Sequence, residues 1–538
     1  MTPPPADPST KQPLRPTAIV SNTSNVPNLS SPRSKEIAIL AALISALAIW
    51  FVWGAFEPIP LIEDEYSYVL QSRIFASGHW TAPAPPLPEF FQQAHVLTVP
   101  RVASKFFPGH ALLMSIGSFV GNPALIPLVL TGISAALIFL LMRRVTNDWV
   151  AGLTLLVWLS DPLNLRYRAA YYSEVTSGTV WLLSWWALLE WRQSRERRWL
   201  LVLAAAIGWG AITRPLTMLA FAVPVGIIVL RDVMRDVMPA KRWTDLGLAT
   251  AVGIAILAII PLWSAKTTGN WRLTPQTLYT QDYLPYDHPG FGVDKTLPRM
   301  KLNPVNQFTY AGFYDEHAKH TPANLPRIAF ARLAAIAHEE WHGARIALAP
   351  FVVLGLFSMT PEIAFALACA VALFLGYLSY GHWAQWTLYY FEALPILSAL
   401  AALGLWRAIE FVRARTRLHD VRLLGATTAL LVVALDVAAV QRARFEHKRT
   451  ANWDLTFRAA LNGLPTKAAV IFVHFAPGLR PHSNVVMNSP HLDEEPIWIV
   501  NDLGERDREL MHYAGERVPM LFDEITGRFE LSRQFAPR

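Results

Sequence analysis

The amino-acid sequence predicts an all-α polytopic membrane protein that carries a small α/β domain at its C-terminal end. Three observations support this prediction. The 538 residues are 53% hydrophobic and only 16% charged, whereas a soluble chain of this length would carry more charge on its surface. The apolar residues form blocks, several of them long enough to cross a bilayer, which takes about 20 residues per helix. Basic residues cluster between these blocks, as in membrane proteins of defined orientation.

The expected transmembrane helices, about 11 in number, are apolar stretches of the sequence. They cover residues 37–56, 123–142, 148–161, 174–191, 199–213, 215–231, 244–263, 345–358, 361–380, 388–406 and 423–440. The connections at 143–144, 192–198, 231–242 and 407–422 are rich in arginine. Placing all of them in the cytoplasm gives one topology, with a cytoplasmic N-terminus and an extracytoplasmic C-terminus. The net charge of +7 is thereby assigned to membrane orientation, and no nucleic acid partner is expected.

The chain divides into three predicted parts. Residues 1–34 are rich in Pro, Ser, Thr and Asn, and are expected to be a disordered cytoplasmic tail. Residues 35–440 would form the transmembrane domain, with long outer loops at 57–122 and 264–344. Residues 441–538 contain the apolar runs AVIFVHF and PIWIVND and the amphipathic stretch ERDRELMHYA, which together predict an extracytoplasmic soluble α/β domain.

The first outer loop opens with an acidic pair, Asp64 and Glu65. From Asp64 to Ser77 the apolar residues recur at helical spacing, which predicts an amphipathic helix lying along the membrane surface. Residues 107–120 are apolar but short, and crossing the membrane with them would reverse every later loop. They are therefore expected to be interfacial or re-entrant.

Ionisable and aromatic side chains gather at the outer ends of the predicted spans. Charged groups at membrane depth are costly and usually line a cavity or a pathway, so a shared cavity is expected on this face. Besides Asp64 and Glu65, its expected members are Tyr66, Arg101, Lys105, His110, Tyr172, Glu174, Arg214, Tyr390 and Glu392. Each also has an ordinary structural explanation, because such acids cap helices, such cations anchor at headgroups and such tyrosines form aromatic belts.

These residue types together favour sugar transfer from a lipid-linked donor. A carboxylate at the membrane surface can act as general base on an acceptor hydroxyl. Nearby cations can bind a lipid phosphate and stabilise it as a leaving group. The sequence contains no Asp-x-Asp pair, so the usual metal site for nucleotide sugars is missing. No cofactor requirement is indicated, and a divalent metal ion stays open.

Two other functions are compatible with parts of the sequence. His338-Glu339-Glu340-Trp341-His342 matches the H-E-x-x-H pattern, which on a helix places two zinc-ligating histidines on one face. A membrane zinc metalloprotease is thus an alternative, although no downstream motif indicates the third protein ligand that a catalytic zinc ion needs. A non-catalytic transporter of lipid-linked sugars would place charged residues deep in several spans, and Asp436 is the clearest such residue.

The stretch DEYSYVLQSRIFASG, which begins at Asp64, resembles the first outer loop of the GT-C superfamily of membrane glycosyltransferases. The resemblance is to bacterial Rgt-type glycosyltransferase-like proteins and to protein O-mannosyltransferases. It continues through ASKFFPGHALLM, YYSEVTSG, ITRPLTML, TGNWRLTPQTLYTQDY, YYFEALPILSALAALGL, FVHFAPGLRPHSNVVMN and PIWIVNDLGERDRELMHY. A GT-C-like fold is thus implied for the transmembrane domain.

The resemblance also implies function and residue roles. It implies a multi-pass enzyme of the bacterial inner (plasma) membrane and cell envelope that moves one hexose or pentose from a polyprenyl-phosphate carrier. The acceptor would be an extracytoplasmic glycan, lipid or protein. Asp64 would be the catalytic base, Glu65 its support and Lys105 a ligand of the donor phosphate, to which topology adds Arg101 and Arg214. One proline, Pro108, follows the Lys-aromatic pair where the family often has two.

Overall fold

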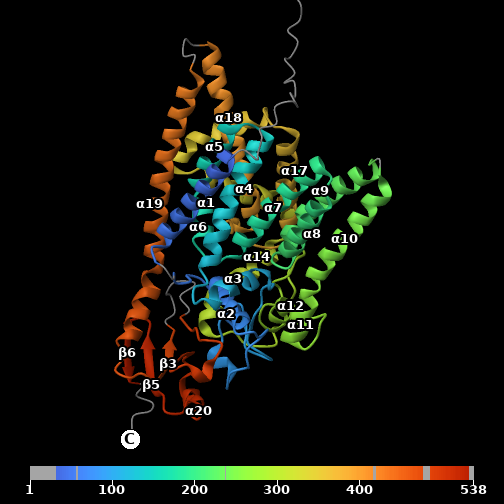
Figure 1. Ribbon diagram of the computed structural model, residues 1–538. Coiled ribbons are helices and arrows are strands. Elements are labelled where there is room, and N and C mark those ends of the chain that lie inside the picture. The colour runs from blue at the N-terminus through green and yellow to red at the C-terminus, as the bar shows by residue number, and fades with distance from the viewer. Residues whose placement is uncertain (1–31, 56–57, 237, 416–419, 476–484, 532–538) are drawn as a thin grey trace, which may run out of the picture.

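The computed structural model describes residues 32–55, 58–236, 238–415, 420–475 and 485–531. The predicted disordered tail lies outside the described residues up to residue 31, and the described part opens with a helix that begins at Pro32. Figure 1 shows a bundle of long helices with a small sheet at its lower end.

The long helices coincide with the apolar blocks of the sequence, and each predicted span falls on at least one of them. Their bounds are α1 (Pro32–Trp53), α4 (Leu125–Val145), α5 (Asp148–Leu159), α7 (Ser173–Ser194), α8 (Arg197–Ala211), α9 (Pro215–Met234), α10 (Pro239–Leu257), α11 (Ile259–Thr268), α16 (Ala349–Leu356), α17 (Pro361–Tyr377), α18 (Leu394–Arg415) and α19 (Val421–Asn462). Local signals set several of their ends. Asn147 caps α5, Thr360 caps α17 ahead of Pro361, and Gly269 ends α11 in a left-handed conformation.

The predicted fold class, a helical polytopic membrane protein, is confirmed. Among the described residues, 6 helices are long and apolar enough to cross a membrane, or up to 7 when the bent pair 343–356 and 361–377 counts as one span. The predicted number of about 11 spans is not confirmed. Helices α5 and α8 are only 12 and 15 residues long, and α7 is rich in Ser, Thr and Trp.

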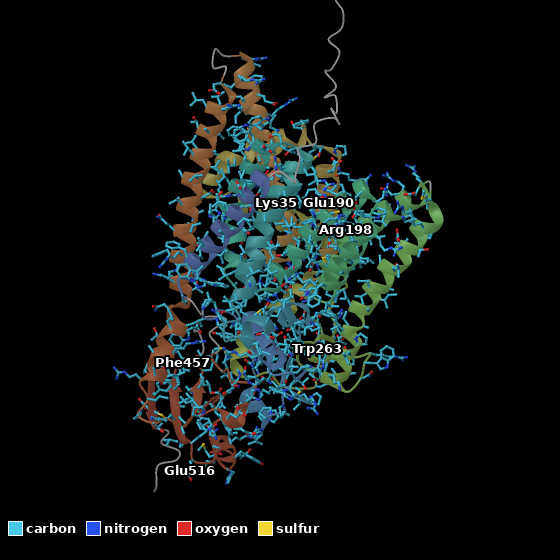
Figure 2. The ribbon with its side chains drawn as sticks, in the orientation of Figure 1. Lys35, Glu190, Arg198, Trp263, Phe457 and Glu516 are labelled. Carbon is cyan, nitrogen blue, oxygen red and sulfur yellow. The ribbon has the colours of Figure 1, made fainter. Side chains whose placement is uncertain are left out.

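The two ends of the bundle differ in what they carry. Figure 2 shows Lys35, Glu190 and Arg198 toward the upper end, and Phe457 and Glu516 at the lower end. The arginine-rich connection after α7 therefore lies at the end opposite to the sheet. Helix α19 runs along one side of the bundle and joins these two ends (Figure 1).

The C-terminal part is a four-stranded sheet, in the order β4-β3-β5-β6. Strands β3 (Ala469–His474) and β4 (Ile497–Asn501) form on the two predicted apolar runs, followed by β5 (Val518–Asp523) and β6 (Arg528–Leu531). Strand β3 is parallel to β4 and β5, and β6 is antiparallel to β5. The amphipathic stretch yields only the short α20 (Asp507–Met511), and η6 (Leu492–Glu494) and η7 (Gly504–Arg506) complete this part. The expected domain start at residue 441 lies inside α19, which continues unbroken to Asn462.

Smaller elements connect the long helices, and Figure 1 places α2 and α3 between the bundle and the sheet. They are α2 (Glu63–Ala76), η2 (Pro88–Phe91), β1 (Val96–Leu97), β2 (Ala103–Ser104), α3 (Gly109–Phe119), α6 (Pro162–Arg168), α12 (Pro275–Tyr283), α13 (Pro304–Thr309), α14 (Phe313–Lys319), η3 (Pro322–Asn324), α15 (Leu325–Glu340), η4 (Gly343–Leu348) and η5 (Thr387–Ala393). The sheet is attached to the first outer loop, because the Asn501 amide donates to the carbonyl oxygens of Phe90 and Gln92, both at 3.0 Å.

Candidate active site

Helix α2 carries the acidic pair and is more deeply buried than expected. Acidic residues occupy its first turn, where they complement the positive end of the helix dipole. A helix forms where the spacing predicts one, but its polar side is covered by the rest of the loop. Gln71 donates to the carbonyl oxygen of Trp80 at 3.1 Å and accepts from the backbone N–H of Ser104 at 3.0 Å. The Ser67 and Ser104 hydroxyls are 2.6 Å apart.

Asp64 is paired with a histidine that comes from a later part of the same loop. The distance from His95 Nε2 to Asp64 Oδ1 is 2.8 Å, and the two side chains are 15% and 29% exposed. Glu63 and Glu65 on either side of Asp64 are buried. Asp64 is thus the acid of this turn that solvent or a substrate can reach.

The backbone holds His95 firmly in this place. Strands β1 and β2 pair antiparallel, which sets His95 opposite Lys105, and the N–H of Lys105 donates to the His95 carbonyl at 2.9 Å. The same carbonyl accepts from Ser67 Oγ at 3.1 Å, and the His95 N–H donates to the Tyr279 hydroxyl at 3.0 Å. The φ angle of His95 is 64°, in the left-handed region that few residues with a Cβ adopt.

The carboxyl group of Glu65 forms hydrogen bonds with backbone N–H groups. Its two carboxyl oxygens accept from the N–H groups of Leu61 at 3.2 Å and Tyr171 at 3.0 Å. Burial raises the pKa of Glu65 to about 8, although these backbone hydrogen bonds oppose the shift. Glu65 therefore anchors the N-terminal end of α2 to the segment before α7.

Lys105 is also buried and has an acidic partner in the second outer loop. Its Nζ lies 3.6 Å from Asp287 Oδ2, and both side chains are less than 10% exposed. The ammonium group sits over the rings of Tyr279 at 4.9 Å and Phe106 at 5.4 Å. His95 packs against the same two rings. Lys105 and the Asp64–His95 pair thus share aromatic walls, and we call Asp64, His95, Lys105 and Asp287 the outer cluster.

Two tyrosines link the outer cluster to the bundle. Tyr68 stacks on Phe106 with ring centres 4.8 Å apart. Burial raises the pKa of Tyr68, and the nearby carboxylates of Glu174 and Asp64 raise it further. Burial likewise raises the pKa of Tyr172, and Glu65 and Asp64 add to that effect. Asp64 therefore acts electrostatically on both tyrosines.

Glu174, Arg214 and Glu392 form a second group, which we call the ionic core. Arg214 forms ion pairs with Glu174 and, at 3.5 Å, with Glu392, and its Nη2 donates to the Tyr377 hydroxyl at 3.2 Å. The Arg214 side chain is 11% exposed and the two carboxylates are buried. These residues come from α7, the α8–α9 connection, η5 and α17, so the ionic core ties together segments far apart in the sequence.

The other predicted cavity residues occupy separate positions. Tyr66 donates to Asp454 on α19 at 3.0 Å. His110 is fully buried between Thr176 Oγ1 at 2.8 Å and the Tyr171 carbonyl at 3.0 Å, and burial lowers its pKa to about 4. Tyr390 is buried against His382. Each of these side chains is engaged in packing between elements.

Arg101 lies apart from Lys105, although only a few residues separate them. It is exposed and lines a hollow of about 600 Å³. The end of α11, including Lys266, and the turn after α2, including Trp80, complete the lining. The three cations assigned to the donor phosphate therefore occupy three different surroundings.

The structure does not supply the geometry that the zinc alternative needs. Helix α15 ends at Glu340, so His342 falls outside the helix that should place both histidines on one face. Glu339 accepts from Thr387 Oγ1 at 2.9 Å, and Glu340 pairs with Arg345 at 2.9 Å. In the described part of the chain, no three His, Cys, Asp or Glu side chains lie close enough to hold a metal ion.

Asp436, the residue behind the transporter alternative, lies buried in α19. It is within hydrogen-bonding reach of Ser160 and close to Arg345. Arg345 in turn donates to Ser160 Oγ at 2.6 Å and pairs with Glu340. Asp436 thus belongs to a buried polar group that joins α19 to η4 and the end of α5, and this group lies between packed helices.

The sequence did not single out four residues of this region: His95, Asp287, Tyr279 and Tyr310. His95 and Asp287 stand in irregular loop segments with no helical or strand periodicity to mark them. Tyr279 lies in the segment TGNWRLTPQTLYTQDY, which carries part of the resemblance. His95 directly precedes β1, and no pattern in the sequence marks it.

A family match among the comparisons with known proteins agrees with the predicted resemblance. Residues 110–263 match the family described as dolichyl-phosphate-mannose-protein mannosyltransferase. The chain is similar to the solved structures of ArnT from Cupriavidus metallidurans, bound to undecaprenyl phosphate (17% identity, TM-score 0.47, 91% of this chain and 90% of that chain) and apo (16%, 0.48, 90% and 90%). The apo oligosaccharyltransferase of Archaeoglobus fulgidus shows 12% identity and a TM-score of 0.42, over 83% of this chain and 63% of that chain. A search of curated protein sequences finds no significant match.

The family match confirms the resemblance to GT-C membrane glycosyltransferases over the matched segment, which runs from α3 to α11. His110, Tyr172, Glu174 and Arg214 lie within this segment. Asp64 and Lys105 precede it.

Proposed function

We propose that the protein is a membrane glycosyltransferase that moves one monosaccharide from a polyprenyl-phosphate carrier to an acceptor hydroxyl, with Asp64 as the general base. The match of residues 110–263 to a lipid-phosphate-dependent mannosyltransferase family supports glycosyl transfer as the reaction class. The general base is our assignment from the geometry of the outer cluster. The monosaccharide and the acceptor hydroxyl are part of the same proposal.

The accessibility of Asp64 carries this proposal. A general base must reach the proton that it removes, within about 2.6–3.2 Å of the donor oxygen. Glu63 and Glu65 are buried, and Glu65 already accepts two backbone hydrogen bonds. Asp64 is 29% exposed, and its Oδ1 is the oxygen that lies 2.8 Å from His95 Nε2. Asp64 Oδ2 is therefore the oxygen that we assign to the acceptor.

Lys105 supplies the second half of the reaction. As the acceptor oxygen attacks the anomeric carbon, its proton passes to Asp64 Oδ2 and the new glycosidic bond forms. The bond from the anomeric carbon to the phosphate oxygen breaks, and its electron pair leaves with the polyprenyl phosphate. A nearby ammonium group stabilises that charge by a charge-assisted hydrogen bond. Lys105 is 3.6 Å from Asp287, and the proposal requires its ammonium group to exchange this partner for the phosphate.

The membrane orientation completes the proposal. Helix α2, which carries Asp64, lies toward the end of the bundle that bears the sheet (Figure 1), whereas Glu190 and Arg198 beside the arginine-rich connection lie toward the other end (Figure 2). Basic connections favour the cytoplasm. We therefore place the reaction on the extracytoplasmic side of a bacterial inner membrane, with the N-terminus in the cytoplasm.

The test is Asp64→Asn in membranes that contain the full-length protein. Membranes of expressing cells would be supplied with short-chain polyprenyl phosphates bearing mannose, glucose, galactose or arabinose, and release of polyprenyl phosphate would be measured by mass spectrometry. Loss of the base should lower turnover by about 10²–10⁴-fold. Expression and thermal stability should stay those of the wild type, since asparagine keeps the size and one acceptor oxygen.

Asp315→Asn is the matched control, because Asp315 is an exposed acid on α14 in the other outer loop. It should leave release unchanged. Near-normal release by Asp64→Asn would contradict the role of this carboxylate. No release by the wild type from any of the four donors would contradict the proposed reaction.

A further inference from the structure

The imidazole of His95 lies 2.8 Å from the proposed base, and its backbone is held by hydrogen bonds on both sides. It has no role in the bond-making and bond-breaking steps of the proposed transfer. We propose that His95 is the positioning residue of Asp64: it binds Oδ1 and thereby aims Oδ2 at the acceptor hydroxyl. This inference rests on the proposed function.

The protonation of the pair follows from its geometry. An ionised carboxylate only accepts hydrogen bonds, so at 2.8 Å the hydrogen between the two groups belongs to His95 Nε2. The other ring nitrogen, Nδ1, lies 3.2 Å from the Tyr310 hydroxyl. The same hydroxyl lies 3.4 Å from Nε2, so it sits against the ring and not along the axis of one nitrogen. The contact with Asp64 Oδ1 is therefore the one that orients Nε2.

The surroundings leave this ring little freedom. Phe106, Tyr279 and Tyr310 pack around it with ring centres at 5.2, 6.1 and 5.9 Å. Its backbone N–H and carbonyl are both bonded, and its φ of 64° lies where glycine is favoured. An unfavourable backbone conformation persists only where the surrounding contacts determine it. His95 is thus a fixed point on which the more exposed Asp64 side chain can be aligned.

The same contact stabilises the charged form of the base. A hydrogen bond to a carboxylate favours its ionised state, whereas nearby negative charges oppose it. The groups that face Asp64 are Glu65 on its own helix, Tyr68, Tyr172, Glu174 and Tyr310, with His95 as the hydrogen-bond donor. Within this set the His95 Nε2–Asp64 Oδ1 contact, at 2.8 Å, supplies the hydrogen-bond donor.

The first experiment follows the Asp64 carboxyl itself and needs no substrate. Water-soluble carbodiimide labels protonated carboxyl groups, and peptide mapping of the purified full-length protein separates Asp64 from Glu63 and Glu65. In His95→Ala, half-maximal labelling of Asp64 should occur at a pH higher by about one unit, since its donor is lost. His95→Gln, whose amide N–H can replace Nε2, should fall between this variant and the wild type.

The second experiment measures turnover with the donor panel described above. His95→Ala should lower kcat by about 10- to 100-fold, the effect expected of a misplaced catalytic group, with the donor KM unchanged. Its pH profile should lose activity on the acidic side. Adding His95→Ala to Asp64→Asn should cause no further loss, because His95 acts through Asp64. His512→Ala, an exposed histidine on the sheet side, is the control.

The outcomes separate the two proposals. Wild-type labelling and wild-type kcat in His95→Ala, with an inactive Asp64→Asn, would overturn the role of His95 and leave the base in place. An active Asp64→Asn would overturn the base, whatever the labelling shows. If His95→Ala fails to fold, His95→Gln decides: a wild-type labelling curve and pH profile with reduced thermal stability would make His95 a structural residue only.

Discussion

The outer cluster and the ionic core each contain one buried cation, and the two cations are held differently. Lys105 has a single acidic partner, Asp287, at 3.6 Å. Arg214 contacts two carboxylates, and its guanidinium also donates to the Tyr377 hydroxyl. One cation is thus weakly paired and stacked on aromatic rings, while the other is enclosed by a complete set of acceptors.

The acids of the two regions differ in the same sense. In the ionic core both carboxylates are buried and face Arg214. In the outer cluster the acid Asp64 is 29% exposed and has one oxygen directed to His95. Buried ion pairs contribute little net stability when intact, but breaking one leaves an uncompensated charge. We therefore expect the loss of one charge to cost more stability in the ionic core than in the outer cluster, for which we propose the chemistry.

The largest expected effect is that of Arg214→Ala. It would leave Glu174 and Glu392 buried without their cation, which costs about 3–5 kcal/mol when one partner of a buried pair is removed. We expect a large fall in the free energy of unfolding, measured by thermal or denaturant unfolding in detergent. Arg166→Ala is the matched control, because Arg166 is 54% exposed and 3.5 Å from Glu339, and such pairs contribute about 0–1 kcal/mol.

One outcome of the Arg214→Ala experiment would contradict the distinction between the ionic core and the outer cluster. If the variant kept its stability but lost binding of the donor phosphate, Arg214 would belong with Lys105 and not with the ionic core. The sequence prediction that grouped the two would then hold.

Lys105→Ala should have a smaller effect, and of another kind. A hydrogen bond to a charged group contributes about 1.5–3 kcal/mol, so the donor KM should rise by roughly ten-fold or more. Release of polyprenyl phosphate across a range of donor concentrations measures it, with the exposed Lys295→Ala as control. Lys105→Ala with Asp287→Asn removes both charges and separates loss of binding from destabilisation by an unpaired Asp287. An unchanged donor KM in both variants would remove Lys105 from the phosphate site.

The sequence predicts the helices of this protein better than the contacts of its site. Apolar blocks locate α4, α9 and α17, because a span of this kind is a local property of the chain. The Asp64–His95 contact instead depends on how β1 and β2 fold back within the loop, and Lys105 meets Asp287 across two separate loops. Such pairings leave no periodic pattern. Lys105 and Arg214 could thus be placed near the same end of the bundle, but their different partners could not be derived.

The smallest expected effect concerns Glu65, to which we assign a structural role although it is adjacent to Asp64. Burial raises the pKa of Glu65 from its ordinary value of 4.5 to about 8. Between these values the folded protein keeps a proton that the unfolded chain has lost, so this group makes stability fall as pH rises from about 4.5 to about 8. Glu65→Gln cannot lose a proton. In thermal unfolding at pH 5, 7 and 8.5, the variant should gain stability relative to the wild type at each step.

Activity gives the second measurement on Glu65→Gln. Glutamine keeps one acceptor for the N–H of Leu61 or Tyr171, so α2 should stay in place and release of polyprenyl phosphate should fall only a few-fold. A loss as large as that expected for Asp64→Asn would show that Glu65 acts in the chemistry itself. Glu65 would then be a residue of the reaction and would belong to the outer cluster together with Asp64.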